Sequence, residues 1–157
     1  MIYLKIDGID GIVTAKGHEK WIEADSFSFG VGRSAMIETG GGKERSVSKP
    51  SLSEVTVTKQ LDLSSPKLFA ETCVGTGKKV QVHFVRSSEQ LATYLEYELE
   101  DCLLTGYSVS GGGSGDPVET ISMSFAKIMM KYTPFDKNNK AGNPVPAGYD
   151  IQKGVKM

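Results

Sequence analysis

The sequence predicts a mainly β protein: an antiparallel β-barrel of two curled sheets, with one short flanking α-helix and one long extended loop. Apolar and polar residues alternate along most apolar stretches, which is typical of strands with one buried face. In two long strands the apolar set changes parity midway, near Asp25 and near residues 126–127, and each change predicts a bulge. Strands with such bulges belong to sheets that curl, so we favour a closed or nearly closed barrel over a flat sandwich.

The N-terminal third of the chain contains three of the predicted strands. The first covers residues 2–6 and ends in a turn at Gly8 and Gly11. The second runs from about 20 to 31, and the third from 51 to 61. Residues 31–49 between them hold four glycines and show no sustained period, which predicts the long loop. Loops of this length in compact domains are usually functional or disordered.

One short helix follows the third strand. Ser65 can cap it, Pro66 fits the first helical position and Gly75 is placed to end it. Its apolar stripe at spacings of three and four consists of Leu68, Phe69, Thr72 and Cys73. A helix this short is not stable alone in water, so its stripe must pack on the sheet or on the mouth of the barrel.

Three further strands complete the predicted barrel. They cover residues 80–84, 95–99 and 121–132, and the middle one has Glu96, Glu98 and Glu100 on the face opposite its apolar residues. The segment from 138 to 146 reads as a loop, and 149–151 as a short final strand. The interior is predicted to be crowded with aromatic and methionine side chains: Phe27, Phe29, Phe84, Met123 and Phe125.

Length and charge limit the classes of function. A chain of 157 residues suits a single domain, which we assign to residues 1–157. The 18 Lys and Arg nearly balance the 19 Asp and Glu, so we expect neither nucleic acid nor a membrane surface as a partner. We find no apolar stretch long enough to span a membrane and no secretory leader, which predicts a protein made in the cytoplasm.

The two cysteines, Cys73 and Cys102, do not form a metal-binding pattern. We expect two buried, small apolar side chains. A disulfide between them is the one possible pairing, but a chain made in the cytoplasm gives no reason to expect it.

Other candidates for chemistry fail on their context. The glycine clusters at 40–43 and 111–115 lack the strand-to-helix junction of a phosphate-binding loop, and we interpret them as flexible turns. His18 lies in a polar turn and His83 on a polar strand face, so both are expected to be solvated. An enzyme would need two of four residues to converge in a cleft: His83, Glu96, Glu98 and Asp101. We therefore predict no catalytic residue, no cofactor and no metal.

Many short segments match a known family in order and spacing over nearly the whole chain. They are residues 3–11 (YLKIDGIDG), 21–22 (WI), 26–30 (SFSFG), 57–62 (VTKQLD), 64–66 (SSP), 96–103 (EYELEDCL), 116–119 (DPVE), 125–128 (FAKI), 132–134 (YTP) and 147–150 (AGYD). The chain resembles Hcp, the haemolysin-coregulated tube protein of bacterial type VI secretion systems. The single segments are not diagnostic, but their order and spacing are specific.

The resemblance implies a structural subunit of the inner tube of this secretion system. Hexameric rings would stack into a hollow conduit inside a contractile sheath, be exported with the spike, and carry or chaperone effector proteins in the lumen. The implied partners are other copies of the chain, the spike protein, the sheath and the effectors. Export without a cleaved signal peptide fits the missing leader.

The resemblance also implies roles for particular residues. Ring-stacking candidates lie in the long loop: Arg33, Lys43, Glu44 and Arg45. Ser28 and Ser114 match positions that face the lumen. The acidic row Glu96, Glu98 and Glu100 can be a solvated stripe, or it can meet lysines of a neighbouring subunit.

A monomeric barrel that binds a small ligand is the alternative function, since barrels of this size can enclose one. The crowded aromatic interior argues against it.

Overall fold

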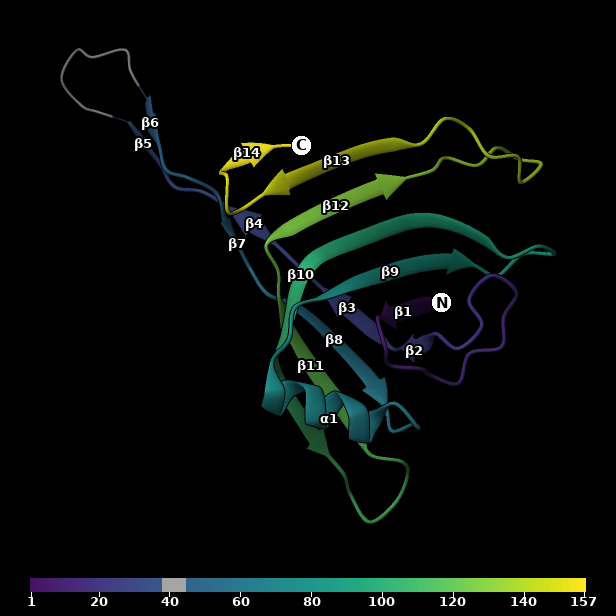
Figure 1. Cartoon of the computed structure of the whole chain (residues 1–157). Coiled ribbons are helices and arrows are strands. Elements are labelled where there is room, and N and C mark those ends of the chain that lie inside the picture. Colours follow the sequence, from purple (N-terminus) through teal and green to yellow (C-terminus); the bar gives the residue numbers. More distant parts are fainter. Residues whose placement is uncertain (38–44) are drawn as a thin grey trace.

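The computed structural model describes residues 1–37 and 45–157, and its main body consists of two curled antiparallel sheets that share one long strand (Figure 1). The strands of sheet A, in spatial order, are β2 (Ile22–Ala24), β1 (Ile2–Ile6), β9 (Lys78–Arg86), the first half of β10 (Ala92–Ser110), β12 (Lys127–Tyr132), β13 (Val145–Asp150) and β14 (Val155–Lys156). Those of sheet B are β3 (Ser26–Ser28), β8 (Val55–Gln60), β11 (Val118–Ser124) and the second half of β10. The predicted mainly β class is confirmed.

The chain passes from one sheet to the other at both predicted parity changes. At Asp25, β2 of sheet A gives way to β3 of sheet B, and the Asp25 N–H donates to the Thr58 carbonyl at 2.8 Å. At Ala126, β11 of sheet B gives way to β12 of sheet A, and the Ala126 N–H donates to the Glu100 carbonyl at 3.0 Å. The predicted bulges are therefore corners, and they keep both halves of each segment facing one core.

The barrel is not closed by hydrogen bonds in the part of the chain that the structure describes. There, β3 pairs only with β8, β2 only with β1, and β14 only with β13. The 19-residue strand β10 provides the link between the sheets, because its first half pairs with β9 and β12 and its second half with β11.

The core lies between the two sheets and is filled. Its fully buried members include Leu4, Ile22, Val57, Leu99, Ile121 and Met123. Aromatic rings pack against them, with the Phe27 ring centroid 4.8 Å from that of Tyr97 and 5.4 Å from that of Phe84. Burial of each such side chain stabilises the fold by about 1.5–3 kcal/mol. Packed rings occupy the interior in which the alternative function would place a ligand.

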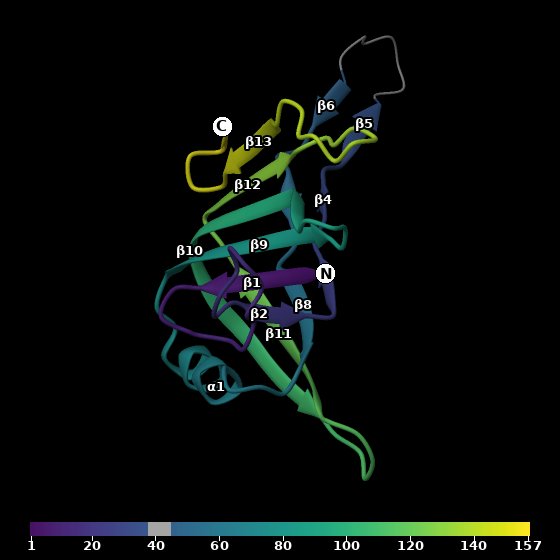
Figure 2. The ribbon, with the colours of Figure 1, turned by 90° about the vertical axis from the view of Figure 1, so that its right-hand side faces the viewer.

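The helix α1 (Ser65–Val74) packs against β10 at one end of the core (Figure 2). Ser64, not Ser65, is its N-cap residue, and Gly75 ends it in the left-handed conformation with φ 71°. The predicted apolar stripe is largely wrong. Leu68 is fully buried, whereas Phe69 is 58% exposed and Cys73 is also exposed. The reason is that a helix of 10 residues has only one narrow face on the sheet.

The cysteines differ in environment and are both free thiols. Cys102 is buried as predicted, and burial raises the pKa of its thiol to about 12. The predicted burial of Cys73 is wrong. α1 is too short and too polar to cross a membrane, and the described residues hold no other α-helix.

The segments predicted as loops contain more strand than expected. The long loop forms two short antiparallel pairs: β4 (Val31–Gly32) with β7 (Ser51–Leu52), and β5 (Ala35–Ile37) with β6 (Arg45–Val47). β13 begins at Val145, inside the predicted loop, and β14 follows it.

A buried ion-pair network joins sheet B to the start of α1. The side chains of Lys59 on β8 and Glu119 on β11 are both fully buried, and Lys59 Nζ lies 2.6 Å from Glu119 Oε2. Lys59 Nζ also lies 3.1 Å from Asp62 Oδ1 and 3.4 Å from Ser65 Oγ, while the Tyr107 hydroxyl donates to Glu119. The network thus ties three strands to the helix.

Candidate functional site

A two-stranded ribbon projects from the body of the molecule (Figure 1). Besides the strand pairs, it is held by serines: the Gly30 N–H donates to Ser53 Oγ at 2.9 Å and the Ser34 N–H to Ser48 Oγ at 2.9 Å. Arg33 lies on it with an exposed side chain. Arg45 begins β6, and the other two ring-stacking candidates, Lys43 and Glu44, lie outside the described residues.

An apolar groove of about 290 Å³ lies where the ribbon joins the body. It is lined from the ribbon by Val31, Pro50 and Leu52 and from sheet A mainly by Met130 and Tyr149. Val31 is 61% exposed, so the base of the ribbon presents apolar surface that the described residues leave uncovered.

The outward face of sheet B carries small hydroxyl side chains. Cross-strand pairing aligns them in two rows, because residues paired across neighbouring strands share a face. One row is Ser28, Thr56, Ser122 and Gly106, and the other is Ser26, Thr58, Thr120 and Ser108. These rows hold no charged residue. Ser28 lies in the first row, whereas Ser114 is exposed in the β10–β11 connection, at the opposite end of the molecule from the ribbon (Figure 1).

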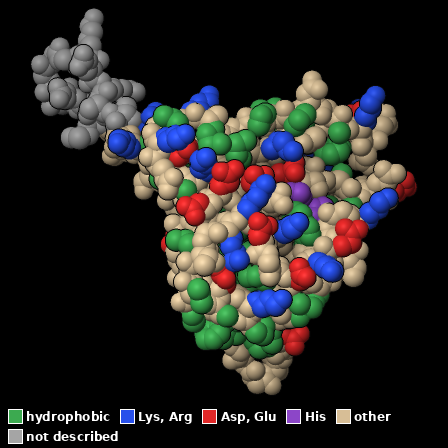
Figure 3. Space-filling model, viewed as in Figure 1, with side chains coloured by type: hydrophobic (Ala, Val, Ile, Leu, Met, Phe, Trp, Pro, Cys, Tyr) green, Lys and Arg blue, Asp and Glu red, His purple; other side chains and the backbone are tan. Residues whose placement is uncertain are grey.

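The outward face of sheet A, in contrast, carries charges of both signs, which gather across the middle of the surface in Figure 3. Each glutamate of the acidic row has a lysine partner in its own chain. The oxygen-to-Nζ distances are 2.7 Å for Glu96 to Lys131, 3.1 Å for Glu98 to Lys79 and 3.6 Å for Glu100 to Lys127. Asp150 also lies 3.9 Å from Lys127. The row is thus nearly neutralised within the subunit.

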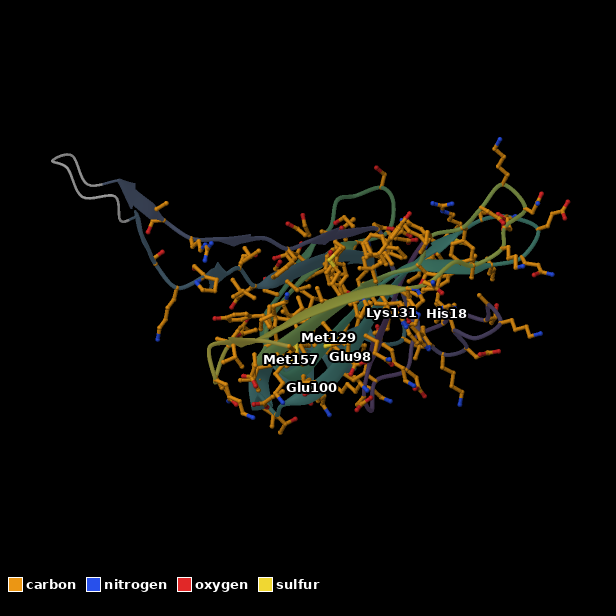
Figure 4. All side chains as sticks on the ribbon, turned by 90° about the horizontal axis from the view of Figure 1, so that it is seen from above. His18, Glu98, Glu100, Met129, Lys131 and Met157 are labelled. Carbon is orange, nitrogen blue, oxygen red and sulfur yellow. The ribbon has the colours of Figure 1, made fainter. Side chains whose placement is uncertain are left out.

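A shallow groove of about 300 Å³ runs over this charged face. Met129, Pro146 and Met157 form its apolar side, and the three glutamates, His83 and Lys131 its polar side. The labelled side chains in Figure 4 lie along this face of the sheet. The ten residues that line the groove include no serine, threonine or cysteine that could act as a nucleophile.

The histidines are not solvated as predicted. His18 is 6% exposed, and its Nε2 lies 2.9 Å from His83 Nδ1, while His83 Nε2 lies 3.2 Å from Glu96 Oε1. Burial lowers the pKa of both rings, that of His83 to about 4, so both are neutral at pH 7. Three of the four residues named as the requirement for an enzyme line this groove: His83, Glu96 and Glu98. The condition that at least two of them converge in a cleft is met. Asp101 is not among the residues of this groove.

The sequence offered no local signal for the buried histidine pair. His83 alternates with Val82 and Phe84, which placed it correctly on the outward face, but the segment that covers it there is 65 residues away in sequence at His18. Nothing local indicates that contact.

Comparison with known proteins gives the family. The family model described as "Type VI secretion system effector, Hcp" matches residues 3–132 of this chain. The chain belongs to the Hcp family. Hcp proteins are structural tube proteins and secreted proteins of type VI secretion systems.

Solved structures agree with this over the full length of the chain. One described as "Structure of a type six secretion system protein" is 29% identical to this Hcp chain, with a TM-score of 0.92 over 99% of this chain and 98% of that one. Hcp1 from Salmonella typhimurium is 26% identical, with a TM-score of 0.81 over 99% and 97%. Hcp2 from the same organism is 26% identical, with a TM-score of 0.73 over 99% and 98%. No curated protein matches this Hcp chain.

Proposed function

We propose that this chain is the structural subunit of the inner tube of a type VI secretion system, assembled as hexameric rings that stack into a hollow conduit. One observation carries the proposal: a type VI secretion protein has the same fold over 99% of this chain with a TM-score of 0.92. The projecting ribbon and its exposed apolar base support it, because such surfaces on a small domain usually mark contacts between proteins.

We assign the lumen to the outward face of sheet B. Its two rows of hydroxyl side chains form a wettable surface without charge, which lets a passenger protein pass without a strong anchor. Ser28 lies in this face, and Ser114 would lie at its rim. The charged face of sheet A then lies away from the lumen.

Contacts between subunits are assigned to two regions. The ribbon residues Arg33, Lys43, Glu44 and Arg45 stack one ring on the next. Glu96, Glu98 and Glu100 contribute at the lateral interface by exchanging some of their lysine partners for those of a neighbour, which is possible because Lys79 and Lys131 are nearly half exposed. The spike, the sheath and effector proteins are the further partners, and the chain is exported after assembly in the cytoplasm. We assign it no catalytic role.

Native mass spectrometry and electron microscopy of the purified protein test the assembly. We expect a species of six times the 16.9 kDa chain mass and rings with a central hole. A small gold cluster on Ser122→Cys is expected inside the hole. The same cluster on Glu23→Cys, exposed on strand β2 at the edge of sheet A, is expected outside it. Cys73→Ser removes the exposed native thiol from both variants.

Two results would contradict the proposal. A monomer at all concentrations would exclude the ring. Gold from Ser122→Cys at the outer edge of the ring would exclude the assignment of sheet B to the lumen, while the ring itself would stand.

Reversing the charge of Arg33 tests the ribbon. We expect Arg33→Glu to leave single rings intact and to reduce stacked rings at least tenfold, because a like charge across the contact costs more than about 1.4 kcal/mol. Lys67→Glu on α1 makes the same change of charge at an exposed site and should stack like the wild type. Counting stacked and single rings in micrographs measures the effect, and equal stacking by both variants would remove Arg33 from the contact.

A further inference from the structure

Residues 7–21, here called the strap, fold over the outward face of β1 and β9. The strap bonds to itself: the Gly11 N–H donates to the Lys20 carbonyl at 2.8 Å and the Val13 N–H to the Trp21 carbonyl at 3.0 Å. It is held on the sheet by a small apolar cluster, separate from the main core, that consists of Tyr3, Val13, Trp21 and Val85. This cluster is much smaller than the main core, so the strap is a part of the fold that can open locally.

The backbone of the strap bonds to the sheet at its start, where the Asp7 N–H donates to the Lys79 carbonyl at 3.2 Å. Further along the strap, the side-chain contact with the sheet is the pair His18 and His83. The His83 ring donates from Nε2 to Glu96 Oε1, since an ionised carboxylate can only accept. In neutral His83 the Nδ1 atom is then unprotonated, so His18 must donate to it from Nε2, at a distance of 2.9 Å. His18 Nδ1 is left as a buried acceptor, and it has no partner among the described residues. The contact therefore fixes one tautomer on each ring.

Some of the groups around the two histidines lower the pKa of the rings and others raise it. Burial opposes a charge on either ring and is the largest effect. Glu96 favours the charge on both rings, as do Glu19 and the Lys16 carbonyl on His18, while Lys131 and the second imidazole oppose it on His83. The ring centroid of Trp21 lies 4.5 Å from that of His83 and 6.0 Å from Lys5 Nζ. Burial and the charge of Glu23 raise the pKa of Tyr3.

We propose that the contact between His18 and His83 is an acid-sensitive latch that holds the strap on sheet A while both rings are neutral and releases it when His83 takes up a proton. A second proton on His83 occupies Nδ1, and the 2.9 Å contact then becomes two facing N–H groups unless His18 moves its own proton from Nε2 to Nδ1. That shift is costly, because His18 Nδ1 is buried and has no hydrogen-bond partner among the described residues. Release would expose the Tyr3, Trp21 and Val85 side chains on this face of the sheet.

The sign of the pH dependence follows from the lowered pKa. His83 binds its proton with a pKa of about 4 when latched and 6.5 when released, so the released state holds more protons between these values. The latch is therefore at full strength above pH 6.5, weakens as the pH falls towards 4, and changes no further below that. If only the protonation of His83 is counted, the equilibrium constant for opening of the strap should be about twentyfold larger at pH 5 than at pH 7.

Amide hydrogen exchange of the full-length protein at pH 7 and pH 5 tests the latch. After correction for intrinsic rates, we expect about a twentyfold loss of protection for the strap amides and little change for β8 and β11 in sheet B. Trp21 is the sole tryptophan and lies in the latch, so its fluorescence should shift to the red over the same pH range.

Variants separate the latch from general acid sensitivity. His83→Gln, which cannot take up a proton, should give strap protection that no longer changes between pH 7 and 5, and Lys79→Gln on the same strand face should behave like the wild type. If His83→Gln does not fold, NMR titration of the two ring signals in the wild type decides, with the pKa of His83 expected at about 4 and that of His18 below 6.5. Unchanged wild-type strap protection at pH 5, a normal His83 pKa, or a twentyfold loss that persists in His83→Gln would each overturn the proposal. The test does not depend on ring assembly.

Discussion

Replacing Glu119 by alanine is expected to lower the free energy of unfolding by about 3–5 kcal/mol, because it leaves the buried ammonium group of Lys59 without its closest partner. Lys59 Nζ would retain Asp62 at 3.1 Å and Ser65 at 3.4 Å, but the Tyr107 hydroxyl would also lose its acceptor. Burial alone would raise the pKa of Glu119, but hydrogen bonds from Lys59, Tyr107 and Ser65 lower it overall. Urea denaturation at pH 7 measures the loss.

Two matched variants test the cause. Glu98→Ala removes a glutamate whose pair with Lys79 is 3.1 Å long but more than a third exposed, and should cost less than about 1 kcal/mol. The double variant Lys59→Met with Glu119→Leu should recover most of the stability lost in Glu119→Ala, since an apolar pair replaces a buried ion pair at little cost. Equal losses in Glu119→Ala and Glu98→Ala would contradict the importance of the buried network.

Replacing Gly11 by alanine is expected to cost about 3 kcal/mol or more, at the upper end for an overpacked site. A Cβ atom there would lie 2.3 Å from the Trp21 carbonyl oxygen and 2.6 Å from the Ile22 Cα, and both are backbone atoms that cannot turn aside. The strap would have to move away from the start of β2, which breaks the bond from the Gly11 N–H to the Lys20 carbonyl. Thermal unfolding measures the effect.

Gly112→Ala is the control for this substitution. A Cβ at Gly112 meets no atom within 4 Å, and the residue lies in the exposed β10–β11 connection, so its unfolding temperature should match that of the wild type. If Gly11→Ala were as stable as Gly112→Ala, the strap would be able to shift without cost, and its close packing would not stabilise the fold.

The corners of the fold were predictable because they leave a trace in the local pattern. A one-residue change in parity at Asp25 or Ala126 is forced when consecutive short strands of different sheets face one core. The inward positions of Lys59 and Glu119 carry the same kind of signal, since each continues the parity of buried residues on its own strand, Val57 and Ile121. We did not use that signal, and it would have found the buried pair.

The ribbon and the histidine pair were not predictable for different reasons. At the base of the ribbon, β4 is exposed at both of its residues and β7 is partly buried only at Leu52, so burial does not set a sustained period of two there. The contact between His18 and His83 depends on how the strap folds back over β9, which is a tertiary effect across 65 residues. The exposure of Phe69 likewise depends on which narrow face of α1 meets β10.

Under the proposed assignment of sheet B to the lumen, its two rows of hydroxyl side chains have a consequence for selectivity. A wall without fixed charge exerts little long-range force on a passing polypeptide, so acidic and basic passengers would be accepted alike. Their retention would then change little with ionic strength, since there is no ion pair for salt to screen. What such a lining can distinguish is size and the supply of hydrogen-bonding groups at a passenger's surface.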